Sequence, residues 1–129
     1  MSIAASLDDL RRDNPGCSLV AFGDLGTRLV LRASSDAPCA QEHYDRICAQ
    51  AAQVFSSCDV VAEASGHSCK DATAATMLTQ TETRIFVRSP ADKVDFICCV
   101  CEPGHSSDAI TSMAATALRE ISQEQKCNL

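Results

Sequence analysis

Hydrophobic positions recur at two different spacings along the chain, and the change in spacing marks the expected elements. Leu7 and Leu10 follow a helical spacing, and the Asn-Pro-Gly sequence at 14–16 ends that helix. Residues 17–22 are almost entirely apolar, whereas residues 27–33 alternate between apolar and polar, with turn residues between the two segments. The beginning of the chain therefore predicts a short helix followed by a β-hairpin.

A long amphipathic helix is predicted next. The Ser-Ser-Asp-Ala-Pro sequence at 34–38 breaks the second strand, and Gly66 is a natural helix C-terminus. Between them, apolar residues step by three or four positions, which is the pattern of a helix with one buried face. These residues are Tyr44, Ile47, Cys48, Ala51, Val54, Phe55, Cys58 and Val61.

The remaining sequence predicts three strands and a final helix. The strands are expected at 73–80, 84–88 and 94–101, and the helix begins at a capping residue within 106–108. The last strand is apolar without alternation apart from Asp95, which is typical of a central strand covered on both faces.

The element order is α-β-β-α-β-β-β-α, and its consecutive strands favour antiparallel pairing. We therefore expect an α+β fold, a five-stranded antiparallel sheet with helices on both faces. The chain of 129 residues suits a single domain, expected at 1–122, followed by a frayed tail at 123–129.

Charge and composition narrow the classes of partner. The net charge of −6 has the wrong sign for a protein surface that binds nucleic acid. No apolar run approaches the roughly 18 to 20 residues of a membrane span, and the first residues lack the pattern of a signal peptide. Nine cysteines is an odd number, which fits reduced thiols. We expect a cytoplasmic protein that binds neither nucleic acid nor membrane.

The Cys-Cys-Val-Cys sequence at 98–101, followed by His105, raises the question of a metal or redox site. Side chains alternate along a strand, so Cys98 and Cys101 are expected to point apart, whereas Cys99 and Cys101 share one face. Cysteine is also a common core residue. We therefore expect core thiols and no metal or cofactor, although His67 and Cys69 could add ligands from a loop.

No nucleophile elbow, phosphate-binding glycine loop or zinc-protease helix is present, so we expect no catalytic residues. Four arginines are a candidate surface for binding a partner protein. Arg28 and Arg32 are expected on one face of the second strand, and Arg84 and Arg88 on one face of the fourth. They either lie in solvent at strand ends or contact an acidic partner surface, for which arginine is well suited.

Short motifs along nearly the whole chain resemble those of the roadblock/dynein light-chain family, which has a profilin-like fold with this element order. The motifs are Leu7-Asp8-Asp9-Leu10 with Pro15-Gly16, the hairpin Asp24-Leu25-Gly26, the strand Leu29-Val30-Leu31-Arg32-Ala33-Ser34-Ser35, and the apolar strand from Phe96 to Cys101 before Glu102-Pro103.

The resemblance implies a non-enzymatic module that forms a dimer with itself or a paralogous roadblock chain. It also implies that the dimer binds a small Ras-like GTPase, or a larger assembly, as regulator or scaffold. In family dimers the second helices pack together and the third strands pair. Carried over, this places the dimer interface at Tyr44, Ile47, Cys48, Ala51, Val54, Phe55, Thr76, Met77 and Leu78.

The sequence supports such pairing independently, because the expected strand at 74–79 contains no charge, proline or glycine that would protect an edge strand. Two other functions stay open. One is a thiol- or metal-responsive sensor, and the other is a small-ligand sensor of the PAS or GAF kind, which would need an apolar pocket.

Overall fold

The computed structural model describes residues 2–66, 73–90 and 94–127, with side chains described as far as residue 123. The described chain contains the expected eight elements in the expected order. They are α1 (Ile3–Arg12), β1 (Cys17–Asp24), β2 (Leu29–Ser35), α2 (Gln41–Ala64), β3 (Ala74–Leu78), β4 (Thr83–Arg88), β5 (Asp95–Cys101) and α3 (Ser107–Cys127).

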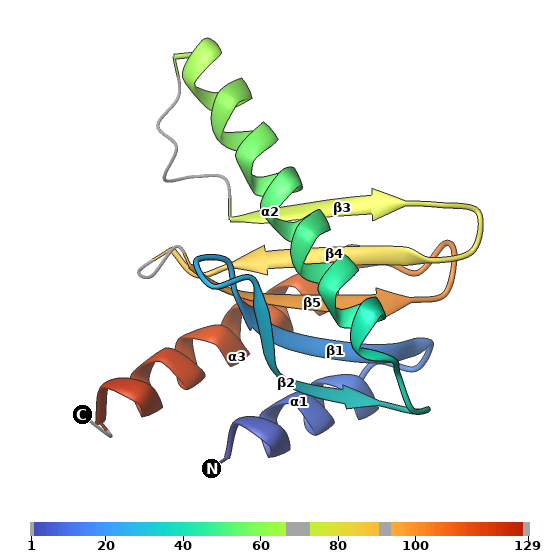
Figure 1. Cartoon of the computed structure of the whole chain (residues 1–129). Coiled ribbons are helices and arrows are strands. Elements are labelled where there is room, and N and C mark those ends of the chain that lie inside the picture. The colour runs from blue at the N-terminus through green and yellow to red at the C-terminus, as the bar shows by residue number, and fades with distance from the viewer. Residues whose placement is uncertain (1, 67–72, 91–93, 128–129) are drawn as a thin grey trace.

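The strands form one antiparallel sheet in the order β2-β1-β5-β4-β3. Helices α1 and α3 cover one face, and α2 crosses the other face diagonally (Figure 1). The predicted α+β fold with helices on both faces is therefore confirmed. Strand β5 lies in the centre and is buried along its whole length, as its unbroken apolar sequence predicted.

The core consists of two apolar clusters separated by the sheet. Under α1 and α3, inward residues of the strands such as Phe22, Ile85 and Ile97 contact Ile110 and Leu118. Under α2, the second cluster joins the other face of the same strands to the helix. Because neighbouring strand residues point to opposite faces, each buried strand contributes to both clusters.

The β1–β2 hairpin differs in detail from the prediction. Strand β2 begins at Leu29 instead of 27, because the carboxylate of Asp24 accepts hydrogen bonds from the backbone N–H groups of Gly26 and Thr27. Arg28 follows with a φ of 59°, a left-handed conformation that cannot continue a strand. Both Thr27 and Arg28 therefore belong to the turn.

The two ends of the chain bear on the expected domain limits. Ser2 caps α1 by accepting a hydrogen bond from the N–H of Ala5. Helix α3 reaches Cys127, well into the segment 123–129. The domain limits of 1–122 and the frayed tail stay predictions. No helix in the described part of the chain is both long and apolar enough to cross a membrane.

Candidate interaction surface

The inner face of α2 belongs to the core of this chain. Ile47, Cys48, Ala51 and Phe55 are buried on the sheet. The predicted interface between helices of two chains included these four residues, but the structure places them on the inner face of α2, against the sheet. An apolar stripe shows which helix face is buried, but not which chain buries it. Their sheet partners include Leu19, Phe86, Phe96, Cys98 and Val100.

The outer face of α2 is the surface that remains available. Tyr44 and Val54 are half-buried at its borders, while Val60 and Val61 are 62% and 64% exposed. These valines belong to the C-terminal part of α2, and the end of this helix extends past β3 (Figure 1). Val60 was missed because it does not fit the apolar stripe. Nothing else in the local sequence marks Val60, since adjacent apolar residues such as Ile47 and Cys48 also occur within the buried stripe of the same helix.

Strand β3 forms the sheet edge beside this overhang. In the described part of the chain it pairs with β4 alone, so its outer backbone groups are open to a further strand. Thr76 is exposed, Met77 is half-buried against the cluster under α2, and Leu78 is 75% exposed. We define the edge surface as β3 together with Val60 and Val61. It contains no charged side chain, so none of the described residues that form it protects it against strand pairing.

Arg84 and Arg88 share one face of β4, as predicted, but that face lies under α2. The guanidinium of Arg88 makes two hydrogen bonds to the carboxylate of Asp59, at 2.9 and 3.2 Å. It also lies 4.7 Å from the ring centre of Phe55. Arg84 donates to Gln50. Both arginines are buried and bind α2 to the sheet, a role that neither prediction for them included.

Arg28 and Arg32 lie elsewhere and are exposed. Arg28 sits in the β1–β2 turn, so the two residues do not share one face of a strand as predicted. Arg32 pairs with Phe22 of β1, which contributes to the cluster under α1 and α3. The four arginines therefore do not form one basic patch, and only Arg28 and Arg32 are accessible to an acidic partner.

The cysteines of β5 alternate as predicted. Cys98 lies in the cluster under α2, whereas Cys99 and Cys101 lie in the other cluster together with Cys17, which pairs with Cys101 across the strands. Hydrogen bonds from Cys101 and Cys99 lower the pKa of Cys17 below its ordinary value. The same contacts, together with burial, raise the pKa of Cys99 and of Cys101.

No metal centre around these thiols is found within the described part of the chain. The described residues contain no group of three or more histidine, cysteine, aspartate or glutamate side chains arranged to hold a metal ion. Instead, both ring nitrogens of His105 contact backbone oxygens, those of Ser106 and Pro15. The two loop residues considered as additional ligands, His67 and Cys69, lie outside the described residues.

Together, the sheet order, the covering helices and the open edge define a roadblock-family fold. No family sequence model matches the chain, and no curated protein matches it in sequence. Among solved structures, the chain is similar to a Roadblock/LC7 domain from Streptomyces avermitilis, with a TM-score of 0.79. The two share 10% identity over 98% of this chain and 99% of that domain.

Two further structures support the same fold. Myxococcus xanthus MglB gives a TM-score of 0.74 with 10% identity, covering 95% of each chain. An MglB structure with a tetrameric arrangement gives a TM-score of 0.66 with 13% identity, covering 89% of each chain. The predicted resemblance is thus confirmed at the level of the fold.

Proposed function

We propose that this protein is a non-enzymatic, dimeric roadblock-type module that binds a small Ras-like GTPase, or a larger assembly, as regulator or scaffold. The observation that carries the proposal is the uncharged edge surface, where an open strand lies beside an overhanging helix. The roadblock fold supports it, because the family resemblance implies dimers that act on GTPases without catalysis of their own.

The dimer interface of the proposal follows from what is exposed. Strand β3 pairs with β3 of a second copy or of a paralogous chain, and this pairing satisfies its open backbone groups. The overhanging ends of α2 then cover the edge and bury Val60 and Val61. Burying these valines on both chains stabilises the dimer through the hydrophobic effect, at about 25 cal/mol per Å² of apolar surface. The interface comprises Tyr44, Val54, Thr76, Met77 and Leu78, together with Val60 and Val61.

Light scattering on the purified chain tests the homodimer. We expect the wild type to have twice the chain mass of 13.7 kDa. Val60→Asp combined with Leu78→Asp should give a folded monomer, because both side chains are exposed in the single chain and their burial in a dimer would desolvate two carboxylates. Aspartates at Ile47 and Phe55 would be uninformative, since burial of those residues means that the chain itself would unfold.

Matched substitutions on the other sheet edge provide the control. Leu29 and Leu31 of β2 are also large, exposed apolar residues. Leu29→Asp with Leu31→Asp should leave the mass at that of a dimer. A monomeric wild type would contradict the homodimer and leave pairing with a paralogous chain. Dissociation of both double variants to the same extent would contradict the proposed interface.

Nucleotide-dependent retention tests the partner class. We expect the immobilised dimer to retain a small GTPase that is loaded with a non-hydrolysable GTP analogue more strongly than the same GTPase loaded with GDP. Hydrolysis rates of the retained GTPase, with and without the module, then separate a regulator from a scaffold. Failure to retain any GTPase in either nucleotide state would contradict a GTPase as the partner. The dimer itself would still be decided by the light-scattering measurement.

A further inference from the structure

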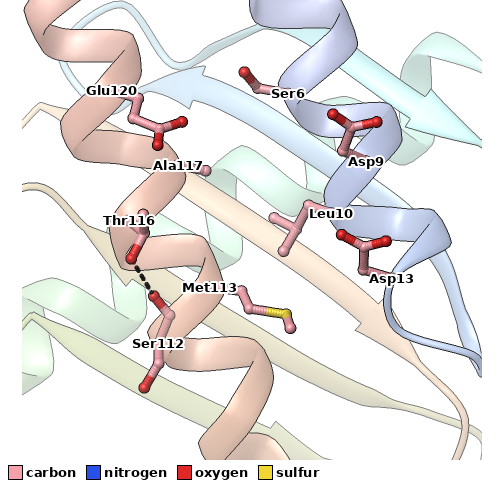
Figure 2. Close-up of a pocket in the computed structure, with 9 residues that line it drawn as sticks. All are labelled: Ser6, Asp9, Leu10, Asp13, Ser112, Met113, Thr116, Ala117 and Glu120. Atoms are coloured by element: carbon pink, nitrogen blue, oxygen red, sulfur yellow. Dashed lines mark hydrogen bonds between the residues drawn. The ribbon is translucent and has the colours of Figure 1, made fainter.

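A groove runs between α1 and α3 on the sheet face opposite α2. Its volume is about 370 Å³, and it is open to the surface. Figure 2 shows Leu10 from α1 and Met113 from α3 pointing into it from opposite walls. Ala117 continues the apolar floor on α3. Met113 is 41% exposed, so its apolar surface is available to an occupant.

The rim of this groove is acidic. Asp9 lies on α1, Asp13 lies about one turn further at the C-cap of this helix, and Glu120 lies on α3 (Figure 2). All three carboxylates are exposed, and none forms an ion pair with a residue of the described chain. The nearby cation Arg119 donates instead to the hydroxyl of Thr116. The lining residues therefore carry negative charge only.

An apolar floor between two helices with an acidic rim fits one kind of occupant. Amphipathic helices bind grooves of this kind through apolar side chains spaced one turn apart. Lysine or arginine on either side of those apolar residues would meet Asp9 and Asp13 on one wall and Glu120 on the other. A second copy of this chain is a poor occupant, because its net charge of −6 would repel the rim.

We propose that the groove between α1 and α3 binds a basic amphipathic helix of a partner protein. The site does not depend on the proposed dimer, because it lies on the opposite face of the sheet from α2 and involves none of the edge surface (Figure 1). A dimer would present two such grooves. The module could then hold this partner while its other surfaces remain occupied.

The test uses a fluorescent synthetic peptide of about 18 residues, long enough to form a helix, with leucine along one face and lysine elsewhere. Binding to the wild-type chain is followed by anisotropy. We expect saturable binding that weakens as salt increases, because screening reduces the attraction between exposed charges. A peptide with glutamate in place of lysine and one with serine in place of leucine should both fail to bind.

Two triple variants with equal net charge locate the site. Asp9→Asn, Asp13→Asn and Glu120→Gln should weaken binding about tenfold, which corresponds to about 0.5 kcal/mol for each exposed ion pair. The control carries Asp36→Asn, Glu42→Gln and Glu63→Gln, which remove three exposed carboxylates outside the groove. The control should bind within about twofold of the wild type, since exposed charges away from the site contribute little.

The apolar floor is tested separately by Met113→Ser, which should weaken the leucine-lysine peptide without abolishing its salt dependence. Equal losses in the two triple variants would show that the peptide responds to net charge alone and would overturn the proposal. So would a wild-type chain that shows no saturable binding. The light-scattering mass of each variant shows separately whether the dimer is intact.

Discussion

At the scale of single residues, Cys17 and Cys48 are both buried, yet their surroundings shift their pKa values in opposite directions. Hydrogen bonds from Cys101 and Cys99 lower the pKa of Cys17. Burial raises the pKa of Cys48 to about 11, and the negative charges of Asp45 and Asp24 add to this effect. The thiolate, which is the reactive form, is therefore favoured at one site and suppressed at the other.

This difference predicts distinct ionisation of the two thiols in the folded chain. Cys48 should stay in the thiol form from about pH 7 to pH 9, because its pKa is raised to about 11. Cys17 should carry more thiolate over the same range, because its pKa is lowered. Carbon NMR shifts of the two cysteine Cβ atoms follow the ionisation without a reagent having to enter the core. Identical titration curves for the two cysteines would contradict the assigned environments.

At the scale of elements, α2 is attached to the sheet by two kinds of contact. Its inner apolar face packs on β1 and β5, while Arg88 and Arg84 of β4 bind its polar residues Asp59 and Gln50. Arg88 is buried, but the side chain of Asp59 is 38% exposed. Solvent therefore screens the ion pair, and its contribution to stability is smaller than that of a fully buried pair.

The attachment of α2 gives a prediction about unfolding. Asp59→Asn should lower the free energy of unfolding by about 1 kcal/mol, since a buried guanidinium loses its carboxylate partner. Adding Arg88→Met should restore part of this loss, because the charge that required the carboxylate is then absent. Urea denaturation measures both. The exposed Glu63→Gln on the same helix should change stability by less than about 0.5 kcal/mol. Additive losses in the double variant would contradict the pairing.

The elements also show what the sequence could and could not predict. Periodicity was enough for the order of the elements, because the apolar repeat of a helix differs from that of a strand. Strand limits depended on turn geometry such as the bonds from the Asp24 carboxylate, which a residue pattern does not reveal. The α2 residues that bind Arg84 and Arg88 lie about thirty positions earlier in the sequence, and only the tertiary structure brings them together.

The groove between α1 and α3 could not be predicted from the sequence either. Met113 belongs to the last helix, but nothing in the sequence of that helix indicated that its side chain stays half outside the core. Asp9 and Asp13 were visible as acidic residues on a first helix. Their proximity to Glu120 depends on α1 and α3 lying side by side on one sheet face, which follows from the sheet order and not from local sequence.

At the scale of the whole molecule, the accessible charge is divided between separate surfaces. Arg28 and Arg32 belong to the β1–β2 turn and to β2, at the opposite side of the sheet from β3. They are therefore free to contact an acidic partner while the proposed dimer occupies the β3 edge. This arrangement predicts that partner binding and dimer formation can be lost independently.

Arg28→Glu with Arg32→Glu should weaken retention of the GTPase at least about tenfold, since each exposed charge pair lost contributes up to about 1 kcal/mol and reversal adds repulsion. The scattering mass should stay that of the wild type. Arg84→Glu is unsuitable for this test, because that side chain binds α2. Unchanged retention by the double variant would remove these arginines from the partner surface.

The two edge strands of the sheet also differ in a way that limits how many chains can join through the sheet. The edge strand β3 has no charged side chain. The other edge strand, β2, carries Arg32, and its pairing with β1 has a register shift at Phe22/Gly23. If two copies join through their β3 strands, both edge strands of the combined sheet are β2 strands. Their charge and irregular register discourage the addition of another strand. Because the proposed twofold contact would use the β3 edge of each chain once, assembly through the sheet would end at two chains and would not continue into a fibre.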